Sequence, residues 1–287
     1  MLRHPVARIF FGLVFVATPV GLLLGPMDAA QGGTLGETPE SRLFVNLATV
    51  ILGYAGYVLF VKLFESRWPK EIGLKRVVPE FGGGLLLGSG LFSATMLLLW
   101  LYGYYDFAGF SETAISLDAY SIAIAGFFEE LLVRGIIFRI LEEILGTVWS
   151  LIASALLFGV MHLANPNAEL WAGIALMLEA GLLLAACYVL TRRLWFAIGT
   201  HVAWNFTQGG IFGLAVSGHE INGLLSGVVT GPDWISGGKF GVEASVIAVA
   251  VCLAAFAIIL RLIVKRGLVL NPIWARPRMQ ETQEHQL

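Results

Sequence analysis

The chain has 287 residues, of which 57% are apolar and 13% are charged, and its mean hydropathy is +0.80. Soluble domains carry about 25% charged residues, so the composition excludes an ordinary soluble protein and predicts an integral membrane protein. The net charge of −2, with no basic segment, argues against nucleic acid as a partner. Cys187 and Cys252 lie inside apolar runs, so we expect neither a disulfide nor a cysteine metal site.

Apolar runs of about 20 residues, the length that crosses a bilayer core, predict an all-α polytopic helical bundle of about eight spans. We expect a single transmembrane domain over 1–267 and a polar tail over 268–287. The first run extends to Leu24, which is long for a cleaved signal peptide, and we interpret it as a retained span. The expected spans are 8–25, 43–64, 81–103, 118–140, 147–165, 169–191, 194–215 and 242–264.

Lysine and arginine concentrate at the amino end, in alternate connections and in the tail, for example at Lys70, Arg192 and Lys265. The other connections, 26–42, 104–117 and 216–241, carry mainly acidic residues, and 216–241 is expected to be an irregular external loop. The positive-inside rule therefore places both termini in the cytoplasm, and we expect the plasma membrane of a bacterium.

Charged residues interrupt the fourth span at Glu129, Glu130 and Arg134. A charge at mid-bilayer depth costs about 2.5 kcal/mol or more, so these side chains indicate a function. Glu130 and Arg134 are four residues apart on a helix and can neutralise one another. Glu129 is rotated by about 100° from Glu130, which makes it a candidate general base.

Two of the five histidines lie in apolar spans, and each has a partner one helical turn away. Phe158 precedes His162 in the fifth span, and Asn205 follows His201 in the seventh. A lone intramembrane histidine is more often a packing residue than a functional one. Two histidines together with the Glu129-Glu130-x-x-x-Arg134 motif favour a shared site.

These three motifs, in this order on three hydrophobic helices, resemble the CAAX prenyl protease and bacteriocin-processing (CPBP) family of intramembrane proteases, also called abortive-infection-like. The resemblance covers about residues 118–208, the expected catalytic core, and continues through the context Leu194 to His201. It implies hydrolysis of a peptide bond in a membrane-embedded or lipidated peptide, as in a type II CAAX endopeptidase.

The resemblance also implies a role for each of the six motif residues. Glu129 and His162 would activate the attacking water, His201 and Asn205 would stabilise the oxyanion, and Glu130 with Arg134 would hold the shape of the site. We favour direct activation of water with no cofactor. The alternative is a zinc ion held by Glu129, His162 and His201, whose donor types suit a three-ligand catalytic site.

Two other functions are compatible with intramembrane glutamate and histidine: a proton- or ion-coupled transporter, and a non-catalytic immunity or scaffold protein of the same fold. Transporters usually show two related halves, and the sequence has no such repeat. Glu179 in the sixth span is a further buried acid that could line the cavity, pair with Arg134 or hydrogen-bond a neighbouring helix. Gly84-x-x-x-Gly88 in the third span indicates close helix packing.

Overall fold

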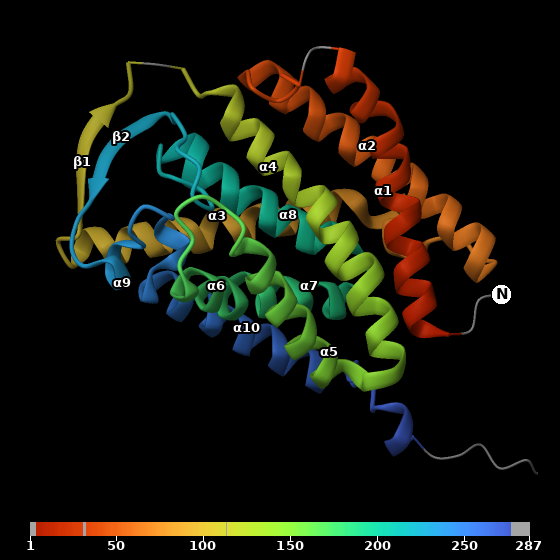
Figure 1. Ribbon diagram of the computed structural model, residues 1–287. Helices are drawn as coiled ribbons and strands as arrows, with labels where there is room; N and C mark the ends of the chain where they lie inside the picture. The colour runs from red at the N-terminus through yellow and green to blue at the C-terminus, as the bar shows by residue number, and fades with distance from the viewer. Residues whose placement is uncertain (1–3, 31–32, 113, 277–287) are drawn as a thin grey trace, which may run out of the picture.

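The computed structural model describes residues 4–30, 33–112 and 114–276, and shows a bundle of helices with one small sheet (Figure 1). The main α-helices are α1 (Pro5–Ala30), α2 (Pro39–Glu65), α3 (Val77–Leu101), α4 (Leu117–Glu130), α5 (Arg139–His162), α6 (Leu170–Leu176), α7 (Leu182–Thr191), α8 (Leu194–Asn205) and α10 (Val246–Lys265). The predicted helical membrane bundle is confirmed. The end of the expected polar tail, 277–287, lies outside the described residues.

Six helical stretches of the described chain are long and apolar enough to cross a membrane. One of them, Leu117–His162, has 46 residues and reverses direction at Gly146, so it contains two of the expected spans. Gly146 has φ +71°, and a Cβ there would lie 2.5 Å from the carbonyl oxygen of Leu270. A side chain would therefore not fit this turn.

The described chain contains three π-helical segments, two of which continue the motif-carrying helices α4 and α8. They are η3 (Leu131–Phe138) after α4, η4 (Met177–Gly181) between α6 and α7, and η5 (Phe206–Ile211) after α8. One extra residue per turn re-aims the side chains that follow, and π-segments of this kind are frequent at functional sites. The expected helices are thus present, but with a local register that the 3.6-residue period does not predict.

Two short strands were not predicted from the sequence. β1 (Tyr105–Phe110) pairs antiparallel with β2 (Leu225–Val229), with an irregularity between Phe107 and Gly109. The sheet joins the two long connections 104–117 and 216–241 at one end of the bundle (Figure 1). The second connection was expected to be irregular throughout, and that expectation was wrong for β2 and for the short helix α9 (Asp233–Ser236).

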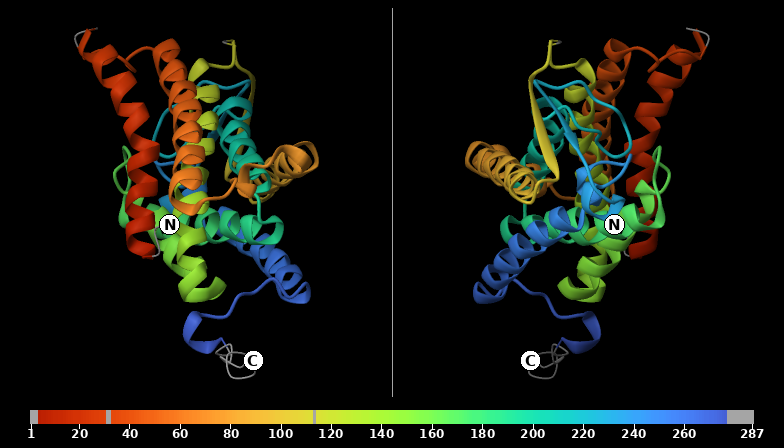
Figure 2. Two further views of the ribbon diagram at one scale, coloured as in Figure 1. Left: turned by 90° about the vertical axis from the view of Figure 1, so that its right-hand side faces the viewer. Right: turned by 90° about the vertical axis from the view of Figure 1, so that its left-hand side faces the viewer.

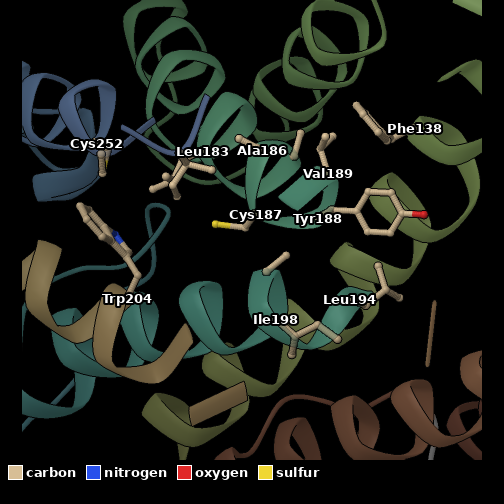
Figure 3. Packing of buried hydrophobic residues seen from close by; sticks show 14 of the residues in the cluster. Phe138, Leu183, Ala186, Cys187, Tyr188, Val189, Leu194, Ile198, Trp204 and Cys252 are labelled. Carbon is tan, nitrogen blue, oxygen red and sulfur yellow. The ribbon is translucent and has the colours of Figure 1, made fainter. Parts of the chain in front are cut away.

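Helix α8 is central, with α3, α4 and α7 packed against it. On the α3 side the two backbones are in close contact at Gly84 and Gly88. A Cβ at Gly84 would lie 2.4 Å from the Phe196 oxygen, and one at Gly88 would lie 2.1 Å from the Thr200 oxygen. The predicted close packing of this glycine pair is therefore confirmed within the chain. On the α7 side, Leu183 and Cys187 of α7 and Ile198 of α8 belong to one buried apolar cluster (Figure 3).

Ion pairs tie the helices together near the start of α1, the end of α2 and the start of α5. The carboxylate of Glu65 is 2.6 Å from the Arg8 guanidinium and 2.8 Å from that of Arg139. Arg67 binds Glu65 and Glu71, at 2.7 and 2.5 Å. Because α1, α2 and α5 all contribute to this network, their ends are held in one arrangement.

Candidate active site

The site is built on a buried ion pair, as the sequence predicts. Glu130 and Arg134 are both 0% exposed, and Nη1 of Arg134 lies 2.7 Å from Oε1 of Glu130. The same guanidinium donates to the carbonyl oxygens of Ala180 and Gly181 and lies 4.7 Å from the centre of the Phe158 ring. A charge that is paired, hydrogen-bonded and stacked in this way can remain in the interior, and it fixes α4 against the α6–α7 region.

His201 is held by that ion pair. Its Nδ1 lies 3.1 Å from Oε1 of Glu130, so the carboxylate fixes the orientation of the ring. The ring also lies against Gly126 of α4, where a Cβ would be 3.1 Å from its Cγ. Gly126 is therefore a positioning residue that sequence reasoning missed, although it stands three residues before Glu129.

His162 is oriented by its own helix. Its Nδ1 lies 2.8 Å from the carbonyl oxygen of Phe158, which accepts the Nδ1 proton. The Phe158 ring contacts both imidazoles, with centroid distances of 4.5 Å to His162 and 5.9 Å to His201. The predicted one-turn pair Phe158 and His162 thus positions the imidazole through a main-chain oxygen as well as through the ring.

Both imidazoles direct Nε2 toward Glu129. The distances to Oε2 of Glu129 are 3.8 Å from His162 and 3.9 Å from His201. That oxygen is buried and has no hydrogen-bond partner. A buried carboxylate oxygen without a partner is costly, so its position between two ring nitrogens marks the place where a further polar group belongs.

A cavity of about 530 Å³ leads to this place, and Glu129, His162, His201 and Asn205 all line it. The amide nitrogen of Asn205 is 3.5 Å from the Ile122 carbonyl oxygen, at the limit of a hydrogen bond. The structure therefore brings four of the six predicted residues to the cavity wall. It places Glu130 and Arg134 directly behind them.

The outer part of the cavity is lined by residues that sequence reasoning did not select. Arg42 of α2 forms an ion pair with Asp118 of α4, at 2.7 Å, and Asn46 donates to the Ser121 hydroxyl at 2.7 Å. Asn46 is a polar residue inside an apolar span, and this is the one feature of the sequence that could have indicated a role for it in the site. Nothing local in the sequence shows that α2 and α4 face each other across the site.

Glu179 does not pair with Arg134, which corrects one of the expected alternatives. Its Oε2 accepts from the Cys252 thiol at 3.3 Å, a contact between η4 and α10. Glu179 lines a second, small cavity of about 30 Å³ behind the two imidazoles, a volume that suits about one water molecule. Both cysteines are free and fully buried.

Glu129, His162 and His201 are spaced more widely than the ligands of a bound zinc ion would be. Ligands around a tetrahedral zinc ion lie about 3.4 Å apart, whereas the two Nε2–Oε2 distances are 3.8 and 3.9 Å. Within the described part of the chain, no group of three or more His, Cys, Asp or Glu side chains is arranged to hold a metal.

Taken together, the fold and the site define an integral membrane protein with a polar, water-accessible pocket of glutamate and histidine inside a helical bundle. Residues 111–207 match the family model described as Rce1-like, "Type II CAAX prenyl endopeptidase Rce1-like". The resemblance carried by the three motifs is thus confirmed for this segment, which supports a CAAX-protease-like intramembrane endopeptidase at the level of the family. No curated protein and no solved structure matches the chain.

Proposed function

We propose that the protein is an intramembrane endopeptidase that hydrolyses a peptide bond of a membrane-bound or lipidated peptide, with water activated by glutamate and histidine. The observation that carries the proposal is the unpartnered Oε2 of Glu129, which faces two imidazole Nε2 atoms at the end of an open cavity. A water molecule can lie about 2.8 Å from both Glu129 and His162, because these atoms are 3.8 Å apart.

In the proposed reaction Glu129 accepts a proton from this water as its oxygen attacks the scissile carbonyl carbon. His162 accepts a hydrogen bond from the same water at Nε2, since Nδ1 carries the proton donated to Phe158. The carbonyl oxygen becomes the oxyanion of the tetrahedral intermediate. When the carbon–nitrogen bond breaks, Glu129 returns its proton to the leaving amine, which leaves a carboxylic acid and an amine as products.

The oxyanion requires hydrogen-bond donors to stabilise its negative charge. Asn205 offers its amide, and His201 offers Nε2–H when both ring nitrogens are protonated. Glu130 at Nδ1 and Glu129 near Nε2 are the two carboxylates that stabilise this imidazolium form. Glu130 and Arg134 are positioning residues in this scheme, because they touch His201 and the helices rather than the substrate.

The test is cleavage of a panel of single-span membrane peptides by the purified protein in liposomes. Glu129→Gln keeps the shape of the side chain and removes the base, so turnover should fall by about 100- to 10,000-fold. His162→Ala should also reduce turnover strongly. The matched control is Glu112→Gln, which changes an exposed carboxylate outside the cavity and should leave turnover close to wild type.

Normal turnover in Glu129→Gln would overturn the proposed chemistry. The transporter alternative has a different signature in the same liposomes: a proton flux that depends on Glu129, with no peptide cleaved. The scaffold alternative requires neither cleavage nor flux, together with a folded protein.

A further inference from the structure

Positive charge is concentrated at one end of the bundle. This end holds the Gly146 turn, the start of α1 and the end of α10 (Figure 2). Its described lysines and arginines are Arg8, Lys62, Arg67, Lys70, Lys75, Arg76, Arg139, Arg192, Arg193, Arg261, Lys265, Arg266 and Arg276. At the opposite end, the only lysine and arginine side chains among the described residues are Arg42 and Lys239.

The cavity opens at the end that is poor in positive charge. Its outer wall is formed by Arg42 and Asp118, near the starts of α2 and α4, and by His219 and Glu220 of the long connection. From Asp118 to Glu129 the helix advances by about 16 Å, so the cavity reaches deep into the bundle from this side.

Between the site and the end rich in positive charge, the bundle is tightly packed and has no opening among the described residues. Glu130 and Arg134 are 0% exposed, and Leu131, Val133 and Ile136 around them are also fully buried. Beyond them, the ion-pair network that contains Glu65 ties α1, α2 and α5 together. The described residues therefore provide water with a route to Glu129 from the cavity mouth and place a packed layer on the other side.

Short connections rich in lysine and arginine stay on the cytoplasmic side of a membrane, and a bias as large as this one determines the orientation strongly. We propose that the active-site cavity opens on the non-cytoplasmic face, and that the substrate is a membrane-anchored peptide presented from outside the cytoplasm. The substrate part of this inference rests on the proposed function. The orientation rests only on the charge distribution and the position of the cavity.

A cavity that opens on the non-cytoplasmic face limits which membrane-anchored peptides can be substrates. A lipidated carboxyl terminus that stays in the cytoplasm cannot reach Glu129, because the packed layer lies between them. The substrate class that fits is an exported peptide held at the outer leaflet by a lipid or a span. Its scissile bond must extend into the cavity as a flexible segment, since a helical backbone does not expose its carbonyl carbons.

The orientation is tested by labelling single cysteines with a membrane-impermeant maleimide in intact bacterial cells that express the full chain. Glu220→Cys, at the cavity rim, should be labelled from outside, whereas Lys75→Cys should be labelled only after the membrane is opened. Both positions are exposed, and the natural chain is the background control because Cys187 and Cys252 are fully buried. The reverse pattern would overturn the proposal.

The substrate side is tested in proteoliposomes of known orientation, with a donor–quencher peptide that carries one transmembrane span and a flexible segment on one defined side. We expect cleavage when this segment lies on the side of Glu220, and at least a tenfold lower rate when it lies on the side of Lys75. The opposite preference would overturn the proposal. If neither peptide is cleaved while labelling shows Glu220 outside, the proposed function fails and the orientation stands.

Discussion

The contact between α3 and α8 predicts that one methyl group will damage both stability and activity. In Gly88→Ala the new Cβ would lie 2.1 Å from the Thr200 carbonyl oxygen and 3.0 Å from the Trp204 nitrogen. Non-bonded contacts are optimal at about 3.5 Å, so the two helices must separate by roughly 1 Å. Overpacking of this kind costs about 1–3 kcal/mol.

The same displacement reaches the site, because Thr200 directly precedes His201 in α8. A misplacement of about 1 Å near reacting groups can reduce a rate by about 100-fold. The assays are thermal unfolding in detergent and peptide turnover in liposomes. Gly88→Ala should unfold at a lower temperature than wild type and turn over much more slowly.

The control is Gly90→Ala on the same helix, where a Cβ meets no atom within 4 Å. Alanine is favoured over glycine in a helix by up to about 1 kcal/mol, so this variant should be as stable as wild type or slightly more stable. If Gly88→Ala behaves like Gly90→Ala in both assays, the close approach of α3 to α8 is refuted, and with it the rigid placement of His201.

Three further predictions concern the site itself. Arg134→Met should lower the free energy of unfolding by about 3–5 kcal/mol, because Glu130 is left buried without its partner. Adding Glu130→Met to the same chain should restore part of that loss. Additive losses of the two substitutions in a double-mutant cycle would contradict the coupling between the two side chains. Asn205→Ala should reduce kcat by about 100- to 1000-fold with a smaller effect on KM, as expected for a donor to the oxyanion, and an unchanged kcat would remove that role. A chelator should leave peptide turnover unchanged if water is activated directly, whereas a lasting loss of activity that zinc reverses would favour the zinc alternative.

The identities of the site residues could be predicted from the sequence because their signals are local. Charges at Glu129, Glu130 and Arg134 are conspicuous in an apolar span, and the pairing of Glu130 with Arg134 follows from helix geometry alone. The structure confirms that pairing and places Glu129, His162 and His201 in one cavity. Their chemical roles stay predictions.

The parts that could not be predicted depend on contacts between distant segments. Nothing in the sequence near Arg42 indicates that it meets Asp118, and nothing near Glu179 indicates that it meets Cys252. The strands β1 and β2 were missed for the same reason, since each is short and is defined mainly by its distant partner. Periodicity reports which face of a helix is polar and does not report which helix that face meets.

One aromatic ring couples the parts of this site mechanically. Phe158 stacks on the Arg134 guanidinium, touches both imidazoles and holds His162 through its carbonyl oxygen. Because this one ring contacts both imidazoles, a displacement of the ring would alter the packing of both histidines at once. The packing around Phe158 therefore links the geometry of the Arg134 ion pair to that of both histidines.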